Sequence, residues 1–538
     1  MLVEFQKHPD SYRHWKFQVE QDLARLTLQV NEDAGLFEGY KLKLNSYDLS
    51  VDMELADALM RIRFEHPQVK AVVITSANDR IFSAGANIFM LGLSSHSFKV
   101  NFCKFTNETR LAMEDASACS GIRFLCAANG ITAGGGYELA LACDEIVLVD
   151  DGSSAVSLPE VPLLGVLPGT GGLTRVVDKR KVRRDLADFF CTTAEGVKGQ
   201  RAVEYKLVDQ AIPKSEWHAG VEARAQKLAA SSQRKKALRP IELKPLTCDK
   251  QEGFLSYDNV KVMLNSKKRM AEVKVLAPTG EEPKTLEAFY AKGSDLWVLK
   301  TYRELEDAIL QLRFNHPDVG LIVFKTEGNP NHVLEAEQTL LSHVASADSF
   351  ANEILLYMKR VLKKIDVTSR SMAALVEPGS AFAGSLAELV LIADRSYMLS
   401  SAEKNEMILS PMNQGSLPMG NGLTRLETRY ISQVSTTGPL DAHACEQLGL
   451  VTFVLDEIDY EDEVRIFLEE RTSFSPDALT GMEANLRFVG PETLETKIFA
   501  RLSAWQNWIF TRDNATGEQG ALTNYGKPTR PQFNFERC

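Results

Sequence analysis

Two glutamates stand in segments whose neighbours would hold a carboxylate close to a ligand. Glu138 follows Gly134, Gly135 and Gly136 in GITAGGGYELALACDEI, residues 130–146, where it interrupts an apolar run. Glycine lets a backbone approach a ligand closely, and a helix that begins there offers unpaired N–H groups and the positive end of its dipole. Such amides can hold a developing oxyanion. A plain helix start with a first-turn acid is the alternative interpretation.

The second acid lies on a stiffened segment. Glu160 stands between Pro159 and Pro162 in SLPEVPLLGVLPGTGGLTR, residues 157–175, and proline restricts the backbone there. Two acids with restrained backbones suit acid/base work on one substrate. IFSAGANI, residues 81–88, again has small residues that allow close backbone approach. A surface turn acid and an ordinary tight turn are the alternatives for these two segments.

The elements that must position these residues alternate between helix and strand. Apolar residues recur at helical spacing over 55–62, and the β-branched run 72–75 follows. A short strand is predicted at 124–127, before the glycines, and another at 146–149, after the apolar helix. Alternation of this kind predicts an α/β fold with largely parallel strands.

The same element order is written twice in the chain. ELADALMRIRFEHPQVKAVVIT, residues 54–75, resembles ELEDAILQLRFNHPDVGLIVFK, residues 304–325, with an offset of 316 − 66 = 250. The same offset pairs Glu138 with Glu388 and repeats the sequence Gly-Leu-Thr-Arg. A constant offset over a unit of roughly 200 residues indicates a duplication and not a short solenoid repeat.

The second copy has lost most of the candidate site. At the offset of 250, Gly135 becomes Ser385, Glu160 becomes Ser410, and Gly85 becomes Glu335. Because Glu335 replaces a glycine needed for close approach, we expect no working oxyanion hole there. The second copy is therefore predicted to be a structural partner, with a thioester-binding regulatory site as the alternative.

The length of the chain indicates how many domains it contains. A chain of 538 residues predicts about three or four domains, which we place at 1–260, 261–456 and a helical and extended tail at 457–538. In that tail Trp505, Trp508 and Ile509 form an apolar stripe suited to packing or oligomerisation.

The charge balance and the cysteines indicate the compartment and exclude some partners. A net charge of −11, from 61 Lys and Arg against 72 Asp and Glu, argues against a nucleic-acid binder. The N-terminus has no signal-peptide core, and no apolar run is long enough to span a membrane. The eight scattered cysteines contain no CxxC pair, which favours reduced thiols, a cytoplasmic location and no structural zinc.

Taken in order, AGAN, GGGYEL, PE and PGTGG over roughly residues 40–210 resemble the crotonase (enoyl-CoA hydratase/isomerase) superfamily. The resemblance implies a crotonase-type spiral of ββα units, here in two tandem copies with the second degenerate, followed by C-terminal helices. It implies that the Ala86 and Gly135 amides form an oxyanion hole for a CoA thioester, and that Glu138 and Glu160 handle water and protons. CoA would be part of the substrate, with no separate cofactor and no metal.

The resemblance also extends to CoA binding and assembly. Arg80 matches a position where family members often carry a base near the CoA phosphates, and a solvated surface charge is the alternative. Family members are usually oligomers, and a homodimer is predicted here. Cys103, in the segment 91–120 that walls the acyl pocket in the family, would hold or donate a proton to an oxygenated ring. A small buried thiol is its alternative.

The length, the degenerate second copy and the tail at 504–533 resemble a branch of the family that opens an aromatic ring. That branch cleaves epoxidised benzoyl-CoA with two waters, giving dehydroadipyl-CoA semialdehyde and formate in aerobic benzoate degradation. One alternative is a plain enoyl-CoA hydratase or isomerase with a structural second unit. Another is a non-enzymatic binder that uses the basic stretch 234–269, which is otherwise a solvated junction.

Overall fold

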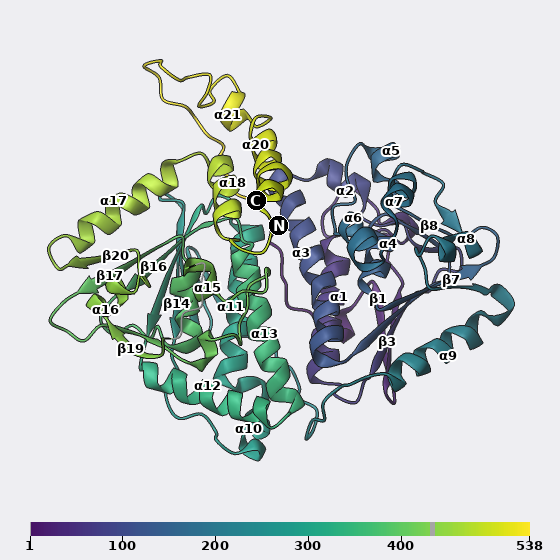
Figure 1. The fold of residues 1–538 in the computed structure, drawn as a ribbon, viewed down its shortest axis with the longest axis horizontal. Coiled ribbons are helices and arrows are strands. Elements are labelled where there is room, and N and C mark those ends of the chain that lie inside the picture. The colour runs from purple at the N-terminus through teal and green to yellow at the C-terminus, as the bar shows by residue number, and fades with distance from the viewer. Residues whose placement is uncertain (1, 431–435) are drawn as a thin grey trace. The chain divides into compact units, whose positions relative to one another are not determined.

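The apolar runs predicted as strands form the central sheet of a first unit, residues 5–243 and 347–353, in the computed structural model (Figure 1). The structure describes residues 2–430 and 436–538. The first two strands of the sheet form an antiparallel hairpin and the others pair in parallel. The order across the sheet is β1 (Trp15–Glu20), β2 (Leu23–Leu28), β3 (Ala71–Ser76), β5 (Arg123–Ala128), β7 (Glu145–Asp150) and β10 (Gln210–Pro213).

A second, smaller sheet in this unit carries the candidate motifs. Its four short strands lie in the order β4 (Ile81–Ser83), β6 (Ile131–Ala133), β8 (Ala155–Ser157) and β9 (Val197–Lys198). The SAGAN turn follows β4, helix α4 (Gly135–Ala142) follows β6, and helix α5 (Glu160–Leu164) follows β8. Since β4, β6 and β8 pair in parallel, their carboxyl ends bring these three segments to one edge.

Three longer helices complete the first unit. Helix α1 (Leu49–Phe64) packs against α3 (His96–Asp115). Helix α9 (Trp217–Ala230) covers β3 and β5 and buries Val221 and Ala225 among the strand side chains. Burial of such apolar side chains is the main driving force for this packing.

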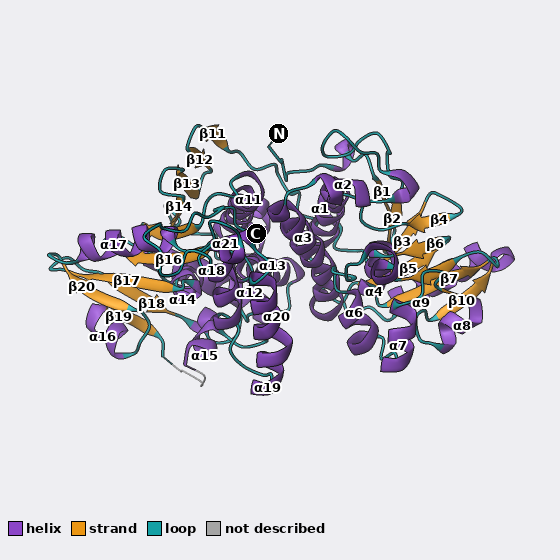
Figure 2. Cartoon of the chain, turned by 90° about the horizontal axis from the view of Figure 1, so that it is seen from above, coloured by secondary structure: helices purple, strands orange, loops and turns teal. Residues whose placement is uncertain are grey.

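The second unit, residues 2–4, 244–346 and 354–538, repeats the arrangement around an eight-stranded sheet. Figure 2 shows its orange strands with purple helices beside them. The first four strands pair antiparallel, and the fourth then begins a parallel series with the remaining four. The order is β11 (Asp249–Gln251), β12 (Phe254–Ser256), β13 (Val260–Asn265), β14 (Met270–Leu276), β15 (Leu321–Glu327), β16 (Ser371–Val376), β17 (Arg395–Ser400) and β20 (Phe453–Asp456).

The predicted α/β fold and its duplication are confirmed, with one local departure. Strands β3 and β15 begin 321 − 71 = 250 residues apart, and β7 and β17 begin 395 − 145 = 250 residues apart. The segment that matches the SAGAN turn, however, lies in helix α12 (Pro330–Ala345). Glu335 is thus a helical residue, and the second unit has no strand and turn at the matching positions.

The tail contains helices α17 (Tyr460–Ser473), α18 (Pro476–Leu486) and α20 (Ser503–Ile509). Helix α17 buries Tyr460 and Phe467 in an apolar cluster with strands of the second sheet. A side-chain carbon at Gly481 of α18 would lie 2.9 Å from Ile509 Cδ1. The predicted apolar stripe therefore packs within the chain.

In the described residues, no helix is both long and apolar enough to cross a bilayer.

Candidate active site

Ala86 lies in a turn that is held against Tyr47. The Tyr47 N–H donates to the Gly85 carbonyl over 2.9 Å, and the Asn87 N–H donates to the Tyr47 carbonyl over 2.8 Å. In a parallel bridge of this kind the N–H of the middle residue points away from the partner segment. The Ala86 amide therefore faces away from the Tyr47 backbone, as an oxyanion donor must.

Gly135, the other predicted donor, begins helix α4 directly beside this turn. Gly134 adopts φ 52° and ψ −130°, which a residue with a side chain rarely adopts. A Cβ at Gly85 would lie 2.5 Å from the Gly135 nitrogen, so the two turns pack backbone against backbone. The Gly135 N–H is among the first amides of α4, which have no acceptor inside their own helix. The structure thus brings Ala86 and Gly135 together.

Glu138 is buried and bound to the PGTGG loop. Its Oε1 accepts the Thr170 N–H over 2.9 Å and the Gly172 N–H over 2.7 Å, and its Oε2 accepts the Thr170 hydroxyl. Burial raises the pKa of Glu138, and the donors of Thr170 and Gly172 partly offset that effect. Glu138 therefore fixes the loop as well as placing a carboxylate at the site.

Glu160 has the opposite surroundings. It is 9% exposed, and its Oε2 is buried with no hydrogen-bond partner among the residues that the structure describes. A Cβ at Gly134 would lie 2.8 Å from Glu160 Oε1, so the acid reaches the turn that starts α4. Burial, and to a lesser extent the charge of Glu138, raises the pKa of Glu160 to about 7. Glu160 can therefore both hold and release a proton near neutral pH.

The remaining two predicted residues differ in their exposure. Cys103 lies half-buried on α3, where burial and then the charges of Glu138 and Asp52 raise its thiol pKa to about 11. It is therefore a protonated thiol that lies close enough to Glu138 to be affected by its charge. Arg80 is exposed on the turn between β3 and β4, where its backbone binds Asn78 and Ile131.

Sequence reasoning missed the polar groups behind Glu138. Asp52 on α1 and Arg110 on α3 form a buried ion pair of 2.5 Å, and the charge of Arg110 favours the ionised form of Glu138. Thr170 could have been found, because it stands inside the PGTGG motif. Tyr47 and Asp52 stand in NSYDLSVD, where no spacing distinguishes them from ordinary helix-flanking residues.

In the second unit, the groups that match the candidate site bind other side chains of the same unit. The Ser385 N–H, which matches that of Gly135, donates to Glu337 Oε1 over 2.8 Å. Glu388 accepts from Asn413 over 2.6 Å and pairs with Arg425 over 3.0 Å, and all three groups are buried. The Ser410 hydroxyl accepts the Met412 N–H and so caps a helical turn. The prediction that this unit lacks an oxyanion hole agrees with this geometry.

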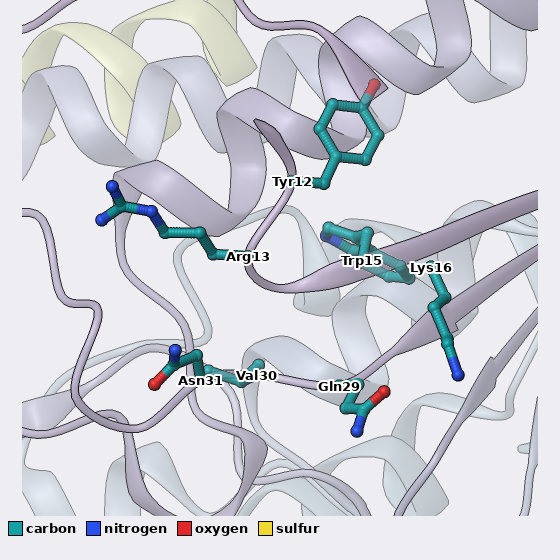
Figure 3. A pocket seen from close by; sticks show the side chains of 7 residues that line it. All are labelled: Tyr12, Arg13, Trp15, Lys16, Gln29, Val30 and Asn31. Carbon is teal, nitrogen blue, oxygen red and sulfur yellow. The ribbon is translucent and has the colours of Figure 1, made fainter. Parts of the chain in front are cut away.

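A separate hollow of about 380 Å³ lies along the β1–β2 hairpin (Figure 3). The side chains around it are mixed polar and apolar, and none belongs to the motifs described above. It is lined by Tyr12, Arg13, Trp15, Lys16, Gln29, Val30 and Asn31. The hollow is therefore no part of the candidate active site.

Comparison with known proteins places these motifs in context. Residues 41–272 match the model of the enoyl-CoA hydratase/isomerase family. The whole chain is 52% identical to the benzoyl-CoA-dihydrodiol lyase of Aromatoleum evansii, over 98% of that protein. A stretch of 173 residues, 32% of this chain, is 32% identical to the alpha subunit of the fatty acid oxidation complex of Shewanella loihica, of which it covers 23%.

Among solved structures, an enoyl-CoA hydratase of Geobacillus kaustophilus is 34% identical, with a TM-score of 0.35. The match covers 41% of this chain and 75% of that one.

Proposed function

We propose how the site works from the premise that the chain belongs to the enoyl-CoA hydratase/isomerase (crotonase) family, within which its full-length relative is a benzoyl-CoA-dihydrodiol lyase. The chain is a lyase of that type, with a ring-cleaving function in benzoate degradation. One observation carries this conclusion: the 52% identity extends through the second unit and the tail, beyond the matched residues 41–272.

In the proposed reaction the thioester carbonyl binds between Ala86 and Gly135. Both amides belong to turns whose backbones are packed against each other, so they need no rearrangement when charge develops on the oxygen. One such preorganised donor is worth roughly 2.7–4 kcal/mol in other enzymes. The two donors would stabilise the negative charge that reaches the thioester oxygen as a carbon–carbon bond of the ring breaks.

We assign different roles to the two acids. Glu160, with an unpartnered Oε2 and a pKa near 7, protonates the departing oxygen. Glu138, whose carboxylate is fixed by three donors from the PGTGG loop, directs the attacking water. The Cys103 thiol, which stays protonated and feels the charge of Glu138, would donate to an oxygen of the ring.

The proposed substrate is 2,3-epoxy-2,3-dihydrobenzoyl-CoA, which gives dehydroadipyl-CoA semialdehyde and formate. Two waters supply all the added hydrogen and oxygen, so the step requires no oxidant or reductant. We propose that CoA is bound only as part of the substrate, with Arg80 near its phosphates, and that the reaction uses no further cofactor or metal. We also propose a cytoplasmic homodimer.

Formate release from the epoxide tests this function directly. An oxygenase that epoxidises benzoyl-CoA would supply the substrate, and formate would be assayed after the purified chain is added. Formate that appears only with the active chain supports the lyase. The alternative, a plain enoyl-CoA hydratase or isomerase, is favoured by the matched family and predicts rapid turnover of crotonyl-CoA without formate from the epoxide.

A further inference from the structure

Tyr47 touches both halves of the oxyanion hole. Its backbone binds the residues on either side of Ala86, as described above. Its phenol oxygen lies 2.0 Å from the position that a Cβ at Gly135 would occupy. The hydroxyl therefore fills the space beside the Gly135 amide and makes glycine obligatory at that position.

The Tyr47 hydroxyl is a buried donor that has no hydrogen-bond partner in the described part of the chain. The residue is 3% exposed, and its hydroxyl has no well-aligned hydrogen bond to any described residue. The Thr170 hydroxyl lies beside it, but that hydroxyl donates its own proton to Glu138. The ring is held between Phe102, at a centroid distance of 6.1 Å, and the Arg110 guanidinium, 5.4 Å from the ring centre. A hydroxyl that is buried without a partner destabilises the fold, so its presence beside a binding site points to a ligand.

The groups around this hydroxyl keep it in the form that donates. It is faced by the charges of Arg110, Asp52 and Glu138, and by the Thr170 side chain. Burial is the largest effect and raises the pKa of Tyr47 far above neutral pH. The phenol is therefore protonated at neutral pH.

We propose that Tyr47 is a third hydrogen-bond donor of the site, whose hydroxyl binds an oxygen of the bound acyl group beside Ala86 and Gly135. This inference rests on the proposed function, since it takes an acyl-CoA as the ligand. The acceptor is either the thioester carbonyl oxygen or an oxygen on the ring, and each can accept a hydrogen bond from a phenol.

Two conservative variants of the full chain separate a donor to substrate from a donor within the fold. Tyr47→Phe removes a hydroxyl for which the described residues offer no hydrogen-bond partner. Tyr137→Phe instead removes a fully buried hydroxyl that donates to the Leu207 carbonyl over 2.7 Å. We expect Tyr47→Phe to lower kcat on the epoxide 10- to 100-fold without lowering the urea midpoint. Tyr137→Phe should lower the urea midpoint and change kcat less than twofold.

Calorimetric binding of benzoyl-CoA, which has a thioester oxygen but no ring oxygen, identifies the acceptor. Weaker binding by Tyr47→Phe than by the wild type assigns the thioester oxygen. Unchanged binding together with the loss of kcat on the epoxide assigns an oxygen on the ring.

Two results would overturn the proposal, and they are distinguishable. If the wild type binds and turns over its substrates and Tyr47→Phe equals it in both assays, the Tyr47 assignment alone is wrong. If the wild type itself neither binds benzoyl-CoA nor releases formate, the proposed function fails, and the role of Tyr47 fails with it.

Discussion

The two units share one fold but treat the same positions in opposite ways. In the first unit the Gly135 amide lies beside the Gly85 turn and the Tyr47 hydroxyl, and Glu160 Oε2 has no hydrogen-bond partner among the described residues. In the second unit the Ser385 amide is bound by Glu337, and Glu388 is bound by Arg425. The second unit also buries an unpartnered atom, Glu337 Oε2, but its matching amide and its surviving acid are both occupied. A site for a thioester therefore depends on which amide and which acid stay available, and not on the fold alone.

The arginine that follows each Gly-Leu-Thr sequence shows how this difference arises. Arg425 reaches both Glu388 and Asp366, so the second unit neutralises its surviving acid with a buried cation. Arg175 instead pairs with Glu114 over 2.9 Å and donates to the Thr170 carbonyl. The same residue type thus closes one site and supports the loop that holds Glu138 in the other.

The largest effect is expected when Glu160, the acid of the first unit with a pKa near 7, is replaced. Glu160→Gln should reduce turnover of the epoxide by about 10²–10⁴-fold, the usual contribution of a general acid or base. Steady-state formate release measures the effect. Glu195→Gln, a change at an exposed acid of the same unit, is the matched control and should retain activity. Near-normal turnover in Glu160→Gln would remove Glu160 from the mechanism.

The next test gives the first unit the residue of the second. Gly135→Ser places a Cβ 2.0 Å from the Tyr47 oxygen, so the turn must shift and the oxyanion amide with it. We expect a loss of kcat of about 10²-fold or more, comparable to loss of one oxyanion donor. Gly280→Ser, where an added Cβ meets nothing within 4 Å, controls for the serine itself. Circular dichroism verifies that each variant is folded.

Substitution of Glu138 should affect activity, whereas substitution of its counterpart Glu388 should affect stability. Glu138→Gln should lower kcat about 10- to 100-fold, because it changes the group that directs water. Glu388→Gln should leave kcat per folded molecule unchanged but lower the free energy of unfolding by about 2 kcal/mol, since it breaks a buried ion pair while Asp366 still binds Arg425. Equal losses of kcat in both variants would contradict the division of roles between the units.

The pH profile sharpens the assignment of Glu160 as a proton donor. Its pKa of about 7 predicts that kcat/KM is highest at lower pH and falls as the pH rises through about 7, because the protonated form is lost. The profile would be measured with the epoxide between pH 5.5 and 8.5. A rate that instead rises through pH 7 would make Glu160 a base and exchange the roles of the two acids.

The smallest effect concerns the acid that closes the second site. Burial raises the pKa of Glu337 to about 8 in the folded chain, whereas an unfolded glutamate has a pKa near 4.3. The folded state holds this proton more tightly, so its contribution to stability falls by about 1 kcal/mol per pH unit as pH rises between those values. In Glu337→Gln that decline should disappear, which urea unfolding at pH 6 and pH 7 would detect. An unchanged slope would mean that Glu337 is ionised when folded.

Most of the architecture could be predicted because it follows from repeating patterns. The β-branched run at 72–75 and the apolar run at 146–149 became β3 and β7, since apolar strands of this length are stable only when buried in a sheet. The segment around Glu335 could not be placed by the offset, because its helix α12 is long enough to replace a strand and turn. A constant offset aligns residues but does not fix their local structure.

The candidate site was predictable in part for the same reason. Glycine patterns identify backbone segments that pack closely against a ligand or another backbone. They identified Gly135 and the turn that contains Ala86. They do not identify the side chain that occupies the space, so Tyr47 remained unnoticed. Nor does the sequence distinguish a bound carboxylate from a free one, and Glu138 and Glu160 differ in that respect.

The sequence by itself determined the α/β fold, the duplication and the presence of two acids and two glycine-rich turns, because these depend on local pattern and spacing. Only the tertiary structure decided that Glu138 is held by Thr170 and Gly172, and that Glu337 occupies the Ser385 amide. It also decided that Glu160 Oε2 and the Tyr47 hydroxyl have no hydrogen-bond partner among the residues that the structure describes. The physical reason is that desolvation and hydrogen-bond partnership depend on groups far apart in the chain, which become neighbours only when the sheets and helices pack.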